Sequence, residues 1–159
     1  MQKTNAMRIL DQAKIAYQVH EYPHGKDAVD GVSVAELLGQ DVKSVYKTLV
    51  TRGASNPSKA YYVFVIPVYA ELDLKKAAKS VGEKSVEMIH VKEINAVTGY
   101  IRGGCSPVGM KKQFRTTFHN DVTSLDTVMV SGGKIGVQIE LAPDDLINAV
   151  GAQVCDIIM

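Results

Sequence analysis

The residues with the clearest chemical potential lie in one short stretch, Gly99 to Lys112, which reads GYIRGGCSPVGMKK. Its adjacent glycines, Gly103 and Gly104, let the backbone take conformations that are closed to residues with a Cβ. Such a turn can aim several N–H groups at one point and form a small anion-binding concavity. Nearby basic residues could hold a phosphate backbone: Arg102, Lys111, Lys112 and Arg115. The alternative is a tight turn between two strands, whose lysines only keep it in solution.

Cys105, at the apex of this stretch, is a candidate nucleophile. A reactive cysteine needs a neighbouring base or a positive environment that lowers the pKa of its thiol. Arg102 and the N–H groups of the loop could supply the positive environment. No histidine is obviously placed to act as the base, although His119 could fold back. We therefore favour a Cys105 that is not a nucleophile.

Lys47 is the second candidate, because it lies inside an apolar strand pattern, VYKTLV. In a strand, Val45, Lys47 and Leu49 share one face, while Thr48 and its alternate neighbours share the other. If the Val45 face points inward, the lysine enters an apolar wall and needs a partner or a cavity that supplies one. Otherwise its stem packs against the core while its ammonium reaches water. The pattern leaves both interpretations open. Tyr22 likewise either offers a hydroxyl at a strand end or is a half-buried aromatic anchor.

Composition sets the frame for these candidates. The chain has 159 residues, 46% hydrophobic and 22% charged, which fits one soluble domain, 1–159, with a real core. A net charge of +1 gives no global field toward nucleic acid, so any such contact must use a local patch. No long apolar run or signal-peptide pattern occurs, and two cysteines suggest neither a disulfide framework nor a zinc site. We expect a cytoplasmic protein with no membrane contact, reduced thiols, no metal and no cofactor.

Elements that would position the candidates follow from capping residues and hydrophobic periodicity. Helices are predicted from Thr4 to Ile15, from Ser33 to Gly39, from Asp73 to Gly82, from Val91 to Val97 and from Pro143 to Gly151. Strands are predicted at Tyr17–Tyr22, Val45–Thr51, Tyr61–Pro67, Val86–His90, Thr116–Phe118, Thr127–Val130, Ile135–Leu141 and Gln153–Ile158. A glycine-rich turn at 131–133 would join two of them into a hairpin, and 53–59 would join another pair. Strands and helices do not alternate cleanly, so we expect an α+β fold: one mixed, curved sheet flanked by short helices.

Several short motifs resemble those of the YbaK (EbsC) family of aminoacyl-tRNA deacylases and occur in the same order as in that family. These deacylases are related to the editing domain of bacterial prolyl-tRNA synthetase. The motifs span most of the chain: VYKTLV (45–50), LDLKKAAK (72–79), TGYIRGGCSPVGMKK (98–112), VSGGK (130–134) and IEL (139–141). The chain looks most similar to the cysteine-specific branch. The resemblance implies a barrel-like mixed sheet and removal of cysteine from mischarged Cys-tRNA(Pro), with Cys-tRNA(Cys) as a further candidate substrate.

The resemblance also implies site residues. Lys47 matches the lysine that the family needs for activity, and the backbone at Gly103 and Gly104 is assigned a catalytic role beside it. Substrate contacts are assigned to Tyr22, Thr48, Ser106, Pro107, Ser131 and Gly132, and tRNA contacts to Arg102, Lys111, Lys112 and Arg115. Two positions depart from the cysteine-specific relatives: Gln138 replaces an aspartate, and Cys105 replaces an apolar residue.

In that branch the thiol of the bound cysteine is thought to attack its own ester, so that no protein nucleophile is needed. Prolyl-tRNA synthetase would be a transient partner. Two other functions stay open: a deacylase for alanine, serine or threonine that uses water, and a non-catalytic module that binds tRNA or another nucleic acid.

Overall fold

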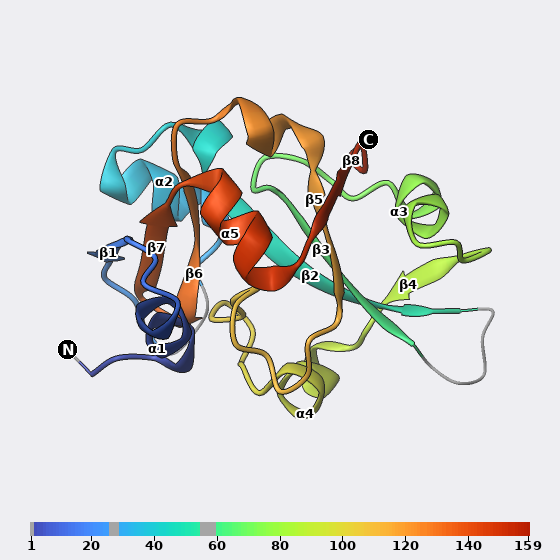
Figure 1. Ribbon diagram of the computed structural model, residues 1–159, viewed down its shortest axis with the longest axis horizontal. Helices are drawn as coiled ribbons and strands as arrows, with labels where there is room; N and C mark the ends of the chain where they lie inside the picture. The colour runs from blue at the N-terminus through green and yellow to red at the C-terminus, as the bar shows by residue number, and fades with distance from the viewer. Residues whose placement is uncertain (1, 26–28, 55–59) are drawn as a thin grey trace.

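The strands form two sheets in the computed structural model of the protein, which describes residues 2–25, 29–54 and 60–159 (Figure 1). The strands are β1 (Gln18–Glu21), β2 (Tyr46–Gly53), β3 (Tyr61–Pro67), β4 (Val86–Met88), β5 (Arg115–His119), β6 (Val128–Lys134), β7 (Val137–Leu141) and β8 (Gln153–Cys155). The larger sheet has the order β4-β2-β3-β5-β8, and the smaller has the order β1-β7-β6. β3 pairs antiparallel with β2 and parallel with β5, so the sheet is mixed, as predicted.

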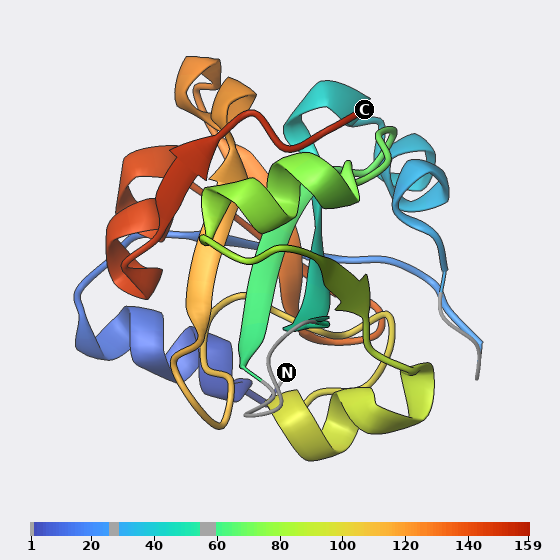
Figure 2. The ribbon, with the colours of Figure 1, turned by 90° about the vertical axis from the view of Figure 1, so that its right-hand side faces the viewer.

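Short helices cover these sheets, which confirms the α+β class. They are α1 (Asn5–Gln12), α2 (Gly31–Leu38), α3 (Leu74–Ser80), α4 (Ile94–Thr98) and α5 (Pro143–Val150), with 3₁₀ turns η1 (Val42–Ser44), η2 (Val91–Glu93) and η3 (Asn120–Ser124). α3 lies across one face of the larger sheet (Figure 2). α1 and α5 pack with the smaller sheet on the other side, through Leu10 and Leu146 in the main core. No helix in the described ranges is long and apolar enough to cross a membrane.

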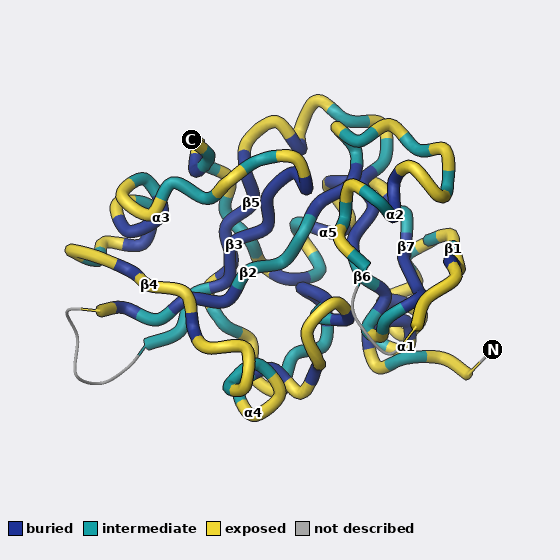
Figure 3. The backbone as a smooth tube through the Cα atoms, turned by 180° about the vertical axis from the view of Figure 1, so that it is seen from behind, coloured by how far each residue is buried: buried dark blue, intermediate teal, exposed yellow. Residues whose placement is uncertain are grey.

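β3 is buried on both faces, as its continuously apolar sequence predicted (Figure 3). Val63 and Val65 belong to the main core, which lies between the two sheets. Phe64 and Ile66 belong to a second cluster under α3. The central strand therefore fixes the position of its neighbour β2, the strand that carries Lys47.

Some bounds of the elements differ from the predictions, such as the end of α1 at Gln12 and of β8 at Cys155. α2 begins at Gly31, because the Asp30 carboxylate, rather than Ser33, accepts the first backbone N–H groups of the helix. The segment 131–134 continues β6 with a bulge and is not a turn, so the hairpin with β7 turns at 135–136. The predicted connection 53–59 lies largely outside the described residues, although β2 and β3 do pair antiparallel.

The prediction that the strands form one barrel-like sheet is wrong. In the described part of the chain the two sheets are joined by a single parallel bridge between Val45 and Met129, and no continuous ladder closes them. Beyond that bridge the pairing of β6 with β7 shifts register between Ser131 and Lys134, and bulges of this kind commonly accompany a bend in a strand. Since β2 and β6 separate there, a space opens between the sheets.

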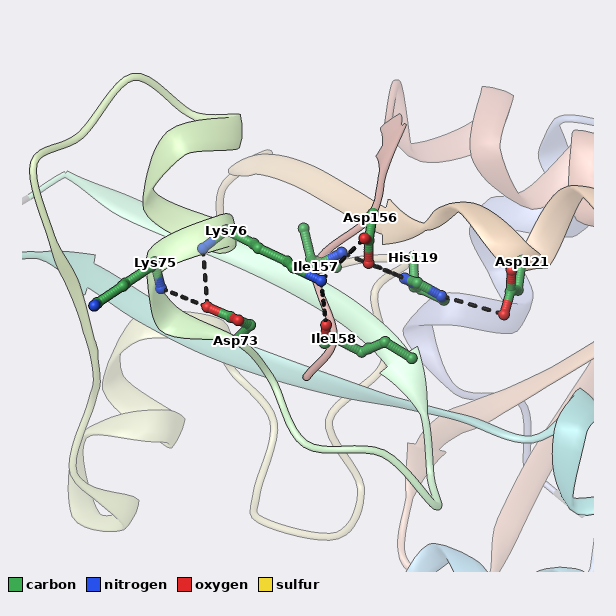
Figure 4. Close-up of polar contacts among 8 residues, drawn as sticks. All are labelled: Asp73, Lys75, Lys76, His119, Asp121, Asp156, Ile157 and Ile158. Carbon is green, nitrogen blue, oxygen red and sulfur yellow. Dashed lines mark hydrogen bonds and ion pairs between the residues drawn. The ribbon is translucent and has the colours of Figure 1, made fainter.

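The C-terminal segment is held to the larger sheet by a polar cluster (Figure 4). His119, at the end of β5, lies between two carboxylates, with Nε2 3.3 Å from Asp121 Oδ2 and Nδ1 3.8 Å from Asp156 Oδ1. Its Nδ1 accepts the Ile157 N–H at 3.4 Å. Lys76 of α3 donates to Asp156 at 3.0 Å and holds the pKa of that carboxyl below its usual range. These contacts serve the packing of the fold, away from the predicted site.

Candidate functional site

A cavity of about 880 Å³ lies where the two sheets separate. Strands from both sheets, the N-terminal end of α2 and the loop after α4 line it. Six of the residues predicted from the sequence meet in its wall: Tyr22, Lys47, Thr48, Arg102, Gly103 and Ser131. The rest of the wall is mostly apolar. Its volume is in the range of pockets that bind small organic ligands, roughly 300–1,000 Å³.

Lys47 is a half-buried cation in this wall. Its strand is covered on both sides: Tyr46 and Val50 lie in the main core, and Leu49 packs against the cluster under α3. No hydrogen bond or ion pair of the Lys47 ammonium occurs among the described residues, so the cavity has to satisfy it. The neighbouring Thr48 hydroxyl is buried and also lacks a hydrogen-bond partner in the described part of the chain. A ligand that accepts hydrogen bonds would supply the Lys47 ammonium with a partner.

The loop after α4 is held by its own hydrogen bonds. The Tyr100 hydroxyl donates to the Val108 carbonyl at 2.6 Å and closes the loop from within. Ser106 is fully buried, and its Oγ accepts the Val108 N–H at 3.2 Å. Gly103 has a φ of +84°, a left-handed conformation that favours glycine, and it lies at the exposed edge of the cavity. The loop therefore presents a fixed backbone at Gly103.

Gly104 lets this loop touch the bulge of β6. A Cβ at this position would lie 2.8 Å from Lys134 Cα and 2.9 Å from Lys134 C, closer than such atoms approach. Both are backbone atoms, so they cannot turn away as a side chain would. The close contact between the two motifs GGCSP and SGGK therefore requires a glycine at this position.

The N-terminus of α1 ties these two segments together. Thr4, the N-cap of α1, donates from its hydroxyl to the Gly132 carbonyl at 2.6 Å. The next side chain, Asn5, donates from Nδ2 to the Gly109 carbonyl at 2.9 Å. One helix end thus fixes both the bulge of β6 and the far side of the loop.

Four of the predicted catalytic and substrate-contact residues lie outside the cavity wall: Gly104, which was assigned a catalytic role, and three of the predicted substrate contacts. Gly104, Ser106, Pro107 and Gly132 do not line it. Ser106 and Pro107 are buried inside the loop, and Gly132 faces the core, where an added Cβ would meet Val137. These positions can shape the site from behind, through the backbone that they hold.

The four predicted tRNA-binding residues divide into two pairs. Arg102 and Lys112 are exposed, and neither makes a side-chain hydrogen bond or ion pair within the described ranges. Arg115 instead donates to the carbonyls of Val81 and Ser80 at 3.3 and 3.4 Å. Lys111 donates to the Ala96 carbonyl at 3.4 Å, at the end of α4. Arg102 and Lys112 are thus better placed to bind a phosphate.

Cys105 lines the cavity, but its environment does not activate it. Burial raises the pKa of the thiol to about 11, with an opposing hydrogen bond to Thr98. No histidine lines the cavity among the described residues, so no base stands beside the sulfur. The structure supports the interpretation of Cys105 as a small wall residue.

This thiol should therefore label slowly with iodoacetamide at neutral pH. Since the reactive thiolate fraction grows about tenfold per pH unit below the pKa, labelling should accelerate in proportion between roughly pH 8 and pH 10. Mass spectrometry of a Cys155→Ser variant, which leaves Cys105 as the sole thiol, measures the rate. Fast labelling that is already constant near pH 7 would show an activated cysteine.

Sequence reasoning missed part of the cavity. Gln138 is 3% exposed and lines the wall, with its Oε1 accepting from Gln40 Nε2 at 2.6 Å. Asp30, the cap of α2, is the single acidic residue of the wall within the described ranges, and bonds from Ser33 lower the pKa of its carboxyl. The sequence singled out Gln138 only as a departure from the cysteine-specific relatives, and no local pattern indicated that Gln138 or Asp30 shares a wall with Lys47. The described residues contain no cluster of three or more His, Cys, Asp or Glu side chains that could hold a metal ion.

Comparison with known proteins gives one family match and a similar curated protein. Residues 26–149 match the family described as "Aminoacyl-tRNA editing domain". Over 156 residues the chain is 47% identical to the "Putative Cys-tRNA(Pro)/Cys-tRNA(Cys) deacylase EbsC" of Enterococcus faecalis (strain ATCC 700802 / V583), covering 98% of this chain and 93% of that protein.

Solved structures share the fold. One, described as a "putative trans-editing enzyme for prolyl tRNA synthetase", has a TM-score of 0.82 at 24% identity and covers 100% of this chain and 99% of its own. Another, the hypothetical protein APE2540, has a TM-score of 0.85 at 22% identity and covers 98% of this chain and 100% of its own.

Proposed function

The chain belongs to the aminoacyl-tRNA editing domain family, and we propose that it is a trans-editing deacylase that removes cysteine from Cys-tRNA(Pro). The observation that carries the proposal is the cavity between the sheets, where the Gly103 backbone shares one wall with the Lys47 ammonium, which has no partner among the described residues. The similarity to a relative named for Cys-tRNA(Pro) and Cys-tRNA(Cys) supports the choice of amino acid. Cys-tRNA(Cys) is the second substrate that this name suggests.

Such a deacylase has a physical reason to exist. A synthetase pocket separates amino acids that differ by one methylene by only about 1–3 kcal/mol, so a pocket for proline also admits smaller amino acids such as cysteine. A second, separate site that hydrolyses the wrong product restores the selectivity. The protein would act in trans, on the mischarged tRNA after the synthetase has released it.

In the proposed reaction the ester carbonyl faces the loop backbone around Gly103. Backbone N–H groups that are fixed before the reaction can stabilise the negative charge that develops on the carbonyl oxygen. Gly104, Ser106 and Pro107 contribute by holding this backbone in place, since the contacts described above keep them out of the wall. Tyr22, Thr48 and Ser131 line the cavity and would surround the aminoacyl group.

The nucleophile is proposed to be the thiolate of the bound cysteine. It attacks its own ester carbon, so a C–S bond forms and the C–O bond to the terminal ribose breaks. The ribose hydroxyl leaves with a proton, and water later opens the released cyclic thioester to free cysteine. The Lys47 ammonium would favour the thiolate form and contact the terminal nucleotide. This route fits a wall whose own thiol, Cys105, has a raised pKa.

Binding of the tRNA would rest on few charges. Arg102, at the cavity, and Lys112, further along the loop, are the exposed cations that we assign to acceptor-stem phosphates; Lys111 and Arg115 would contribute less, since their donors already have partners. Each phosphate contact makes binding weaker at higher salt. With a net charge of +1, the protein alone should bind tRNA weakly. We therefore propose prolyl-tRNA synthetase as a transient partner and the cytoplasm as the place of action.

A deacylation assay with a small set of aminoacyl-tRNAs tests the function. Cys-tRNA(Pro) should be cleaved at least about a hundredfold faster than Ser-tRNA(Pro) or Ala-tRNA(Pro), because only cysteine carries a thiol that can attack. A Cys105→Ala variant should keep nearly the full rate. Rapid cleavage of Ala-tRNA(Pro) would instead indicate a deacylase that uses water, and cleavage of none would indicate a binding module.

A further inference from the structure

Apolar side chains gather at one side of the cavity mouth. In the described part of the chain, Met88, Val91 and Ile101 are exposed by 44%, 56% and 52%, although large apolar side chains are usually covered. All three line the cavity, together with the half-buried Ile94. These four residues form what we call the apolar rim.

The rim is built on firmly held segments. Met88 is the last residue of β4 and pairs with Thr51 of β2. Between Met88 and Ile101 the chain forms η2 and α4, and the Glu93 carboxylate of this part makes an ion pair with Arg52 of β2. Ile101 then opens the loop that carries Gly103. The rim and the proposed ester site are therefore continuous along the chain and share one cavity.

We propose that the apolar rim binds the terminal adenine of the tRNA acceptor end; this inference rests on the proposed function. In an aminoacyl-tRNA the ester is on the terminal ribose, so the adenine lies one sugar away from the reacting carbonyl. With the carbonyl at Gly103, the base reaches the mouth of the cavity, where Ile101 is two residues away. Single-stranded ends are recognised through the flat faces of their unstacked bases, which gain from contact with apolar surface.

The dimensions and charge of the site support a nucleoside as the occupant. A cavity of about 880 Å³ is much larger than a cysteinyl group needs, but suits an aminoacyl group together with its adenosine. Arg102, exposed and without a partner among the described residues, directly follows Ile101 and would face the phosphate next to that adenosine. If the rim bound only a protein, neither the size of the cavity nor the exposed Arg102 would have a role.

Binding to two hairpins that copy the tRNA(Pro) acceptor stem tests this inference without any catalytic step. One hairpin ends in the normal CCA, and the other has an abasic nucleotide in place of the terminal adenosine. By fluorescence anisotropy, the unaltered protein should bind the abasic hairpin about tenfold more weakly, because it loses the contact with the base. A Val91→Ser, Ile101→Ser variant should bind the CCA hairpin about tenfold more weakly and no longer distinguish the two.

Leu37→Ser is the matched control, since Leu37 is also 56% exposed but lies outside the cavity wall. It should bind both hairpins as the unaltered protein does. Equal affinities of the unaltered protein for the two hairpins, or no binding of either, would overturn the adenine site. If the hairpins are distinguished but Cys-tRNA(Pro) is not deacylated, the proposed function fails while the site stands. A loss of synthetase binding alone in the serine variant would assign the rim to a protein partner and also overturn the inference.

Discussion

Replacing Lys47 with alanine should lower kcat/KM for Cys-tRNA(Pro) by at least about a hundredfold, while the fold survives. Removing one fixed donor from a site where charge develops typically costs two to three orders of magnitude in rate. The free energy of unfolding should change by no more than about 0.5 kcal/mol, because the ammonium has no partner among the described residues that its loss would leave unsatisfied. Single-turnover deacylation and thermal unfolding measure the two effects.

Lys43→Ala provides the matched control for this change. Lys43 lies four residues earlier, carries the same charge, is exposed and does not line the cavity. Its loss should alter deacylation by less than about threefold, through weaker attraction of the tRNA alone. If Lys47→Ala and Lys43→Ala had the same small effect, Lys47 would have no role beyond its charge. A large loss of stability in Lys47→Ala would show a structural role instead.

Much of the fold followed from local chemistry. The apolar run of β3 predicted a strand buried on both faces, and Thr4 and Asp73 were correctly assigned as helix caps. The start of α2 was missed, because Asp30 and Ser33 are both good caps and only the observed hydrogen bonds decide between them. Local propensity is a sound guide to elements and a weaker one to their ends.

The division into two sheets was harder to predict. Strand count and the resemblance implied one curved sheet, and nothing local reports where a ladder stops. Two features go with this division: the bulge between Ser131 and Lys134, and the single bridge from Val45 to Met129 that joins the sheets in the described part of the chain. The bridge joins segments that are distant in the sequence, so no local pattern predicts it. The fold class was thus predictable, whereas the opening that makes a site was not.

The candidate site shows the same limit at the level of side chains. Lys47 and Gly103, which the sequence motifs singled out, both line one cavity. The motifs could not distinguish residues that face the cavity from residues that support it, because Ser106 and Gly103 belong to the same motif. Nor could they show that Arg115 already donates to the carbonyls at the end of α3. In both cases the deciding fact is which way a side chain turns.

Gly104→Ala should have the second large effect, on both stability and activity, because Gly104 lies where the loop after α4 touches the bulge of β6. Gly104 does not have a positive φ, so an alanine is compatible with its backbone conformation and only the space is missing. The new methyl group would meet the Lys134 backbone at 2.8 Å, and one of the two segments would have to move. Overpacking of this kind costs typically 1–3 kcal/mol, or roughly 3 to 10 °C in Tm for a domain of this size.

Activity should fall more steeply than stability. The segment that moves carries either Gly103 or Ser131, both in the cavity wall, and a displacement near 1 Å can cost about a hundredfold in rate. The loss should appear in kcat more than in KM, because the Gly103 backbone is proposed to act on the reacting carbonyl, whereas the phosphate contact of Lys112 lies farther along the loop. Gly25→Ala is the control, since its φ is also not positive and a Cβ there meets nothing within 4 Å. Equal values of Tm and kcat for Gly104→Ala and Gly25→Ala would show that the loop does not need its contact with the bulge. That result would contradict the proposal that this contact fixes the Gly103 backbone for catalysis.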